Sequence, residues 1–126
     1  MTKEHLYLGQ SGEEAAVSFI KRNGYRIITK NYKSKLGEID IIARDKGTIC
    51  FIEVKSRKTD RYGLPQEAVS MDKQRHISRA ALLFLKEKNL LNKKARFDVI
   101  SIIYNEGIPK LGLIKNAFEL DARFTP

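Results

Sequence analysis

The chain has 126 residues, of which 42% are hydrophobic and 31% charged, and its formal net charge is +9 at pH 7. This length fits one ordinary domain, and three prolines and eight glycines leave no room for a long disordered linker. The first residues lack the apolar core of a secretory signal, and the longest apolar run, 80–85, is far too short to span a bilayer. We therefore expect a single cytoplasmic domain over residues 1–126, with no membrane partner.

The spacing of apolar residues predicts an alternation of helices and strands. Apolar residues recur at helical spacing before Asn23-Gly24, and β-branched runs flank Asp45-Lys46-Gly47 as the two arms of a hairpin. The predicted elements are a helix, three strands, a helix and two strands, over 12–23, 25–31, 36–44, 48–57, 68–88, 96–104 and 111–117. This order predicts an α/β fold, a three-layer α/β/α sandwich with a central mixed sheet.

Charged residues interrupt both arms of the predicted hairpin. In the first arm, Asp40 stands between isoleucines, where an unpaired carboxylate costs several kcal/mol. In the second arm, Glu53 and Lys55 lie on one face, because side chains on a strand repeat every two residues. Ile49 and Phe51 precede them on that face. The strand therefore switches from burying hydrocarbon to presenting a carboxylate and an ammonium group.

The length of the hairpin turn decides whether the two carboxylates meet. A two-residue turn at 46–47, or equally a four-residue turn at 45–48, places Asp40 directly opposite Glu53. A three-residue turn shifts the pairing by one residue and places Ile52 opposite Asp40. The sequence leaves both registers open.

Two facing carboxylates repel each other unless a divalent cation lies between them. Mg²⁺ suits Asp40 and Glu53 as ligands, because it is usually held by one or two carboxylates together with substrate phosphate, and Mn²⁺ accepts the same oxygen donors. Lys55 beside them can orient an attacking water and offset negative charge at a reacting phosphate. The pattern therefore favours phosphodiester hydrolysis.

Other interpretations of these residues are structural. Asp40 or Glu53 can form a salt bridge with Lys55 that closes the hairpin, and a D-x(12)-E-x-K spacing arises often by chance. Glu13 and Glu14 open the first predicted helix, and a helix packed on the sheet can aim such a carboxylate at the strand ends. The helix dipole equally favours acidic residues in a first turn, and we prefer this explanation for Glu14.

Most of the excess positive charge follows the Glu53–Lys55 segment. Residues 55–96 hold twelve of the 24 Lys and Arg but only four of the 15 Asp and Glu. Such a surplus attracts polyanions, so we expect a nucleic-acid partner, with an ordinary solvated surface as the alternative. The expected phosphate contacts are Arg57, Lys58, Arg61, Lys73, Arg75 and Arg79. Arg96 and Asp98, at the start of a strand, are instead expected to form a structural pair.

A set of short motifs covers almost the whole chain. They are GQSGEEAA at 9–16, NGY at 23–25, GEIDIIA at 37–43, FIEVKSR at 51–57, YG at 62–63, Lys73, RFD at 96–98 and NAF at 116–118. Together they resemble the YraN family of bacterial proteins, which is similar to the archaeal Holliday junction resolvases of the PD-(D/E)xK nuclease superfamily.

The resemblance implies a restriction-endonuclease-like fold. It also implies Asp40 and Glu53 as metal ligands, Lys55 as the catalytic lysine, and Glu13 as the counterpart of the helix glutamate in the resolvases. Ile39 stands where the nominal motif has proline before the aspartate. This departure leaves the carboxylate unchanged.

The sequence thus predicts a metal-dependent endonuclease that acts on DNA, including branched or structured DNA. The alternative is a non-catalytic nucleic-acid-binding module that keeps the nuclease scaffold. A third interpretation is a protein-interaction adaptor that uses the last predicted strand as the edge of a homodimer. A homodimer would also suit an enzyme that cuts both strands of a duplex.

Overall fold

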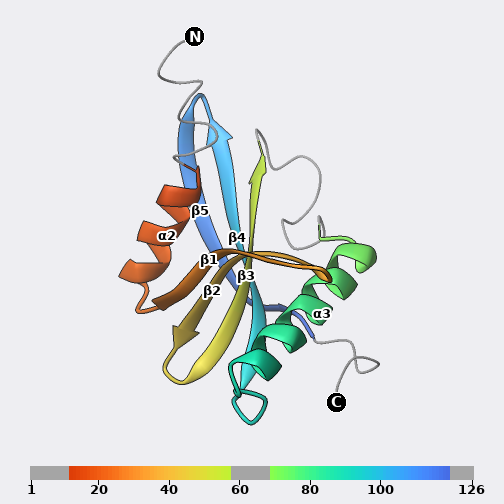
Figure 1. The fold of residues 1–126 in the computed structure, drawn as a ribbon. Helices are drawn as coiled ribbons and strands as arrows, with labels where there is room; N and C mark the ends of the chain where they lie inside the picture. The colour runs from red at the N-terminus through yellow and green to blue at the C-terminus, as the bar shows by residue number, and fades with distance from the viewer. Residues whose placement is uncertain (1–11, 58–68, 120–126) are drawn as a thin grey trace.

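A computed structural model describes residues 12–57 and 69–119 of the chain (Figure 1). The elements in chain order are α2 (Gly12–Arg22), β1 (Arg26–Ser34), β2 (Gly37–Asp45), β3 (Thr48–Arg57), α3 (Met71–Glu87), β4 (Ala95–Asn105) and β5 (Ile108–Phe118). The predicted order of helices and strands is confirmed. The first strand continues three residues beyond its predicted end at residue 31.

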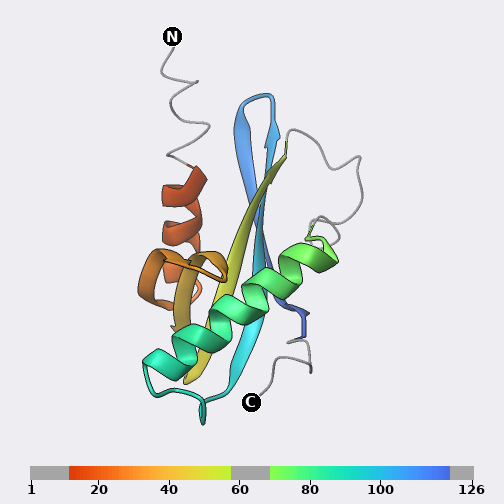
Figure 2. The same cartoon turned by 45° about the vertical axis from the view of Figure 1, so that its right-hand side comes forward.

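The strands form one mixed sheet in the order β1-β2-β3-β4-β5. β3 and β4 are parallel, and the other neighbouring pairs are antiparallel. A parallel pair needs a crossover connection, and α3 lies in that connection. Figures 1 and 2 show α2 and α3 on opposite faces of the sheet. The fold is therefore the expected three-layer α/β/α sandwich of restriction-endonuclease-like type.

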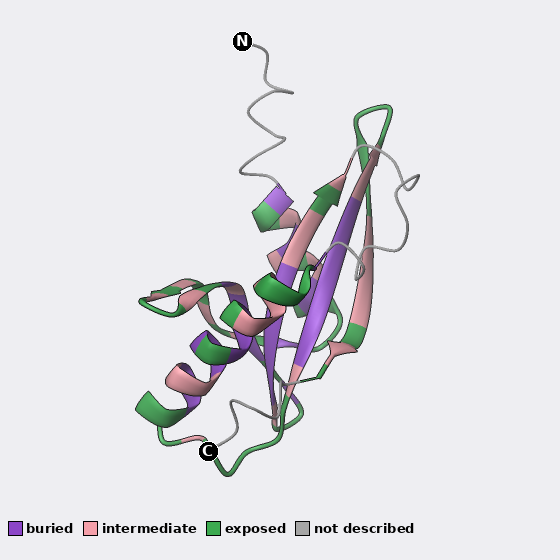
Figure 3. Ribbon diagram, turned by 90° about the vertical axis from the view of Figure 1, so that its right-hand side faces the viewer, coloured by how far each residue is buried: buried purple, intermediate pink, exposed green. Residues whose placement is uncertain are grey.

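Each helix closes a separate hydrophobic core against the sheet. Ala16 and Ile20 of α2, one helical turn apart, pack with Ile52 and Ile100 on one face. The apolar side of α3 packs on the other face, against Ile39, Ile42, Ile49, Phe51, Phe97 and Val99. Figure 3 shows buried residues along the central strands and on the side of α3 that faces the sheet. β3 carries side chains into both cores, so it is the element from which a site can be built most rigidly.

Local signals set the ends of these elements. α2 ends at Asn23-Gly24, where Gly24 has φ +91° and the backbone N–H of Tyr25 donates to the carbonyl of Ile20 at 3.0 Å. Ser70 caps α3 by accepting a hydrogen bond from the backbone N–H of Lys73 at 3.1 Å.

The described elements all belong to this one sheet and its two covering helices. The extension of a single domain to residues 1–126 stays a prediction. Neither helix in the part of the chain that the structure describes is long and apolar enough to cross a membrane.

Candidate active site

The backbone of β2 changes direction at Asp40. The ladder between β2 and β3 ends at the pair Ile41↔Ile52, whereas β2 remains paired with β1 as far as its first residue. Ile39 packs in the core beneath α3 and Ile41 in the core beneath α2, although side chains two residues apart on a regular strand share a face. The outer part of the β1–β2 hairpin therefore leaves β3 and extends toward α3 (Figure 1).

This geometry leaves a fork between β2 and β3, with Asp40 at its vertex. The turn of the β2–β3 hairpin consists of Lys46 and Gly47, with φ +55° and +106°, as in a two-residue type I′ turn. The resulting register makes Asp40 and Glu53 the next residues beyond the Ile41↔Ile52 pair. The register with Ile52 opposite Asp40 is thus excluded.

The carboxylate of Asp40 replaces a backbone acceptor at the fork. Its Oδ2 atom accepts a hydrogen bond from the backbone N–H of Val54 at 2.8 Å. The β2–β3 ladder has already ended at this point, so the side chain satisfies an amide that a straight β2 would have paired. This bond holds Asp40 next to Glu53.

Glu53 is the most constrained acidic residue of the fork. Its side chain is only 7% exposed. The pKa of Glu53 is raised from 4.5 to about 7, mainly by burial and then by the charge of Asp40 and a side-chain hydrogen bond with it, while Lys73 and Lys55 act in the opposite direction. The carboxyl group is therefore poised between its neutral and charged forms at physiological pH.

Two lysines approach Glu53 from different elements. Lys55 Nζ lies 3.9 Å from Glu53 Oε1, and Lys73 Nζ, from the first turn of α3, lies 3.7 Å from the same oxygen. Both distances exceed those of a hydrogen bond. The side chains of Lys55 and Lys73 are 32% and 40% exposed, so both lysines reach solvent, while the Glu53 side chain is almost completely buried. An anion in the fork would meet both of them.

The position of Lys73 adds a contact that the sequence analysis did not expect. Lys73 was expected to contact phosphate, and that role stays a prediction. In the structure Lys73 lies one turn before Ile77 on the side of α3 that faces the sheet, and it pairs with Glu53. The four-residue spacing to Ile77 was the signal that could have revealed this position.

The remaining predicted residues are more dispersed. Glu13 is exposed at the start of α2, and residues 12–57 and 69–119 contain no group of three His, Cys, Asp or Glu side chains arranged to hold a metal ion. Its role stays a prediction. Arg57 ends β3, Arg79 is exposed on α3, and Arg75 pairs with Asp72 at 3.0 Å. Lys58 and Arg61 lie outside the described residues.

A second acidic cluster lies near the β2–β3 turn and confirms the expected pair of Arg96 and Asp98. The guanidinium of Arg96 donates to Asp98 Oδ1 at 3.0 Å, to Asp45 Oδ2 at 2.7 Å and to the hydroxyl of Tyr25 at 2.8 Å. Asp98 also accepts hydrogen bonds from the Tyr25 hydroxyl at 2.8 Å and the backbone N–H of Asn116 at 2.9 Å. The hydrogen bond from Arg96 lowers the pKa of Asp45, although burial opposes it. This cluster is a closed structural network.

Comparison with known proteins extends the resemblance found in the sequence. A sequence model of the uncharacterised protein family UPF0102 matches residues 12–102. A UPF0102 protein of Syntrophus aciditrophicus is 49% identical over 117 residues, which cover 93% of this chain and 92% of that protein. A UPF0102 protein of Geobacter metallireducens is 48% identical over 120 residues, covering 95% and 98%. A third, of Persephonella marina, is 43% identical over 113 residues, covering 90% and 94%.

Proposed function

The chain belongs to the UPF0102 family, and from the geometry of its fork we propose that it is a metal-dependent nuclease that hydrolyses phosphodiester bonds of DNA. One observation carries the proposal: Asp40 lies beside the largely buried carboxylate of Glu53. The ammonium groups of two lysines are close to Glu53 but too far away to form hydrogen bonds with it. A carboxylate pair of this kind is costly in a protein that does not use it.

The donor set fits Mg²⁺. The fork offers carboxylate oxygens, which are the ligands that Mg²⁺ prefers, and it offers two such groups rather than a full cage. Asp40 and Glu53 would hold the ion. The raised pKa of Glu53 supports this assignment, because a divalent cation would offset both causes of the shift, the burial of the carboxylate and its repulsion by Asp40. The bound ion would supply Lewis-acid polarisation of the scissile phosphate and lower the pKa of a water.

The two lysines have distinct tasks in this proposal. Lys55 extends from the same strand and face as Glu53, so it is the group placed to orient a water for attack on phosphorus and to stabilise the developing negative charge. Lys73 comes from α3 and approaches the same oxygen. It favours the charged form of Glu53 before the ion binds and can turn to a substrate phosphate afterwards.

The charge of the chain supports DNA as the substrate. A net charge of +9 favours a polyanion, and the predicted phosphate contacts Arg57, Arg75 and Arg79 lie on β3 and α3, the elements that carry Lys55 and Lys73. A partly buried fork between β2 and β3 also suits a flexible or unpaired DNA strand more than an intact duplex. This preference agrees with the expectation of branched or structured DNA.

The proposal is tested by incubating the purified full chain with Mg²⁺ or Mn²⁺ and linear duplex, single-stranded and junction DNAs, with RNA counterparts in parallel. We expect divalent-dependent cleavage, and a loss of at least about 10²-fold in rate for Glu53→Gln and for Lys55→Met while DNA binding persists. Glu38→Gln, an exposed glutamate on β2, is the matched control and should cut normally. Wild-type protein that binds but cuts nothing would establish the non-catalytic binding module instead.

A further inference from the structure

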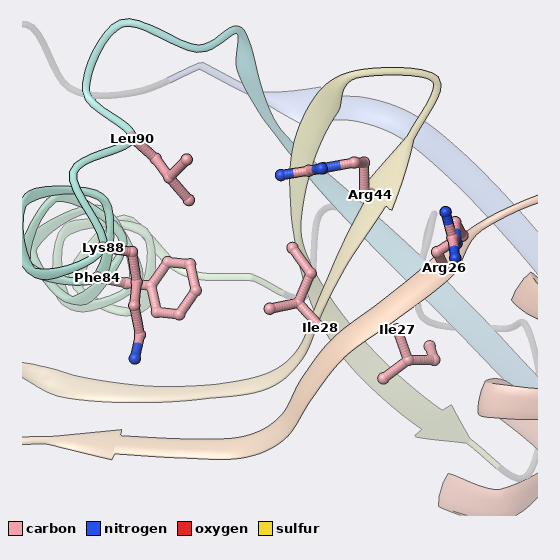
Figure 4. A pocket seen from close by; sticks show the side chains of 7 residues that line it. All are labelled: Arg26, Ile27, Ile28, Arg44, Phe84, Lys88 and Leu90. Atoms are coloured by element: carbon pink, nitrogen blue, oxygen red, sulfur yellow. The ribbon is translucent and has the colours of Figure 1, made fainter.

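A second basic region lies at the far end of α3 from Glu53. It surrounds a pocket of about 350 Å³ between β1, β2 and the end of α3, where the lining includes Arg26, Ile28, Arg44, Phe84, Lys88 and Leu90 (Figure 4). Lys73 and Lys88 are fifteen residues apart in the sequence, which corresponds to about 22 Å along a helix. The pocket is therefore separate from the fork, and its volume lies within the range of small-molecule sites.

In the described part of the chain, the positive charges of this pocket are not paired with acidic side chains. Arg26 and Arg44 are directly opposite each other in the β1–β2 ladder, and like charges in that relation destabilise a sheet. In the described ranges, no acidic side chain forms an ion pair with Arg26, Arg44 or Lys88. Lys88 follows the last residue of α3, where the helix dipole favours a cation. The two arginines have no such compensation, so they favour an anionic ligand.

An apolar gap adjoins the arginines. The pairing of β1 with β2 shifts between Ile27 and Thr29, so Ile28 is the extra residue of a β-bulge and its side chain is left 40% exposed. Bulges re-aim side chains in this way. Figure 4 shows Ile28 and Phe84 facing each other, with the guanidinium of Arg44 reaching toward Leu90 above them. The pocket thus combines a cation with an opening lined by hydrocarbon.

We propose that this pocket binds a nucleotide, with Arg44 and Arg26 holding the phosphate and the gap between Ile28, Phe84 and Leu90 receiving the base. A guanidinium binds phosphate through paired hydrogen bonds and also packs against the flat face of a base. A bare phosphate would use the arginines and leave the apolar gap open to water. A nucleotide satisfies both parts of the pocket, and its source is either a free mononucleotide or an unpaired nucleotide in a strand.

This proposal goes beyond nuclease activity and does not require it. The test is titration of the full chain, followed by backbone amide NMR and calorimetry, with four probes: AMP, adenosine, inorganic phosphate and the single strand (dA)6. We expect saturable shifts at the amides of Ile28, Arg44 and Leu90 with AMP, and binding of AMP at least tenfold tighter than that of inorganic phosphate. If (dA)6 gives the same shifts and AMP gives none, the nucleotide belongs to a strand and the proposal stands.

Variants separate the two parts of the pocket. Arg44→Glu should weaken AMP binding at least tenfold, and Ile28→Ser should weaken AMP binding without changing phosphate binding. Lys110→Glu, the same charge change at an exposed residue of β5, should alter AMP binding less than twofold. Glu53→Gln should bind AMP normally, so a failure of the nuclease proposal leaves this result untouched. Equal binding of phosphate and AMP, or shifts with neither AMP nor (dA)6, would overturn the assignment.

Discussion

Each of the two acidic clusters of this sheet combines two carboxylates with nearby cations, but the pKa of a carboxyl group is lowered in one cluster and raised in the other. Near the β2–β3 turn, Asp45 and Asp98 share one guanidinium, and the hydrogen bond from Arg96 lowers the pKa of Asp45. At the fork, two ammonium groups lie 3.7 and 3.9 Å from Glu53 beside Asp40, and the pKa of Glu53 rises to about 7. In the first cluster, the guanidinium of Arg96 compensates the negative charges of the carboxylates. In the second cluster, the negative charge of Glu53 is only partly compensated.

The difference lies in geometry rather than in charge count. A planar guanidinium reaches several acceptors at once in a fixed arrangement, whereas an ammonium group on a flexible stem acts as a point charge. Arg96 is held at the centre of its cluster by three partners, while Lys55 and Lys73 remain partly in solvent. The first design stabilises the fold, and the second agrees with the proposed binding of a cation and a phosphate.

We expect the largest loss of stability when the cluster around Arg96 is disrupted. Arg96→Met should lower the free energy of unfolding by about 3–5 kcal/mol, because it leaves Asp45 and the fully buried Asp98 without their shared cation. Urea denaturation measures the loss. Arg75→Met is the matched control, since its pair with Asp72 is on the surface and contributes little. Equal losses for the two variants would contradict the structural role assigned to Arg96.

At the fork, replacing Glu53 should raise the free energy of unfolding rather than lower it. The pKa of Glu53 is raised from 4.5 to about 7, so ionising it costs more in the folded chain than in the unfolded chain. Its contribution to stability is present below pH 4.5 and is lost as pH rises through about 7. In metal-free buffer at pH 8, Glu53→Gln should therefore be more stable than wild type by up to about 3 kcal/mol.

The advantage of Glu53→Gln should shrink as the pH falls toward 4.5, and it should vanish below that pH, where wild-type Glu53 is protonated in both states. Denaturation of both proteins at pH 5 and pH 8 measures this difference, and carboxylates common to both cancel in it. Glu38→Gln on β2, the strand next to that of Glu53, is exposed and should stay close to wild type at both pH values. A Glu53→Gln protein less stable than wild type at pH 8 would show that the fork is a structural cluster like the one around Arg96.

Divalent cations should supply the compensation that the fork lacks. At a free Mg²⁺ concentration 100 times the dissociation constant, wild type should gain about 2.7 kcal/mol of stability. The gain should diminish below pH 7, because protons then compete for Glu53. Thermal denaturation with Mg²⁺ and with EDTA measures it, and Glu53→Gln should gain much less. The same gain in both proteins would place the ion elsewhere.

The sequence predicted the features that depend on neighbouring residues. The helices, the hairpin and the shared face of Glu53 and Lys55 follow from apolar spacing and from the two-residue repeat of a strand. The turn signal at Lys46-Gly47 narrowed the register to two alternatives, and the structure selects the one that brings Asp40 to Glu53. The elements and the shared face were therefore predictable from the sequence, whereas the register of the hairpin needed the structure.

The parts that depend on distant segments were not predictable. The approach of Lys73 to Glu53 requires the packing angle of α3, and the kink at Asp40 requires the hairpin to reach that helix. Asp45 was interpreted only as a turn residue, because its partner Arg96 lies 51 residues away. The strand formed by 32–34 has weak β propensity and is fixed by pairing with β2.

Replacing Lys73 should have a smaller effect, because it removes only one of the two lysines that partly offset the charge of Glu53. Lys73 lowers the pKa of Glu53, so Lys73→Met should raise that pKa and move the pH dependence of Mg²⁺ binding upward. Because Lys73 Nζ lies 3.7 Å from Glu53 Oε1 and is 40% exposed as a side chain, the loss in stability at pH 8 should be at most about 1 kcal/mol. Calorimetric titration with Mg²⁺ from pH 6 to pH 9 measures the shift, and Lys86→Met at the exposed end of α3 is its control. An unchanged pH profile would mean that Lys73 serves the substrate alone, and that Lys55 is the cation among the described residues that favours the charged form of Glu53 before a metal ion arrives.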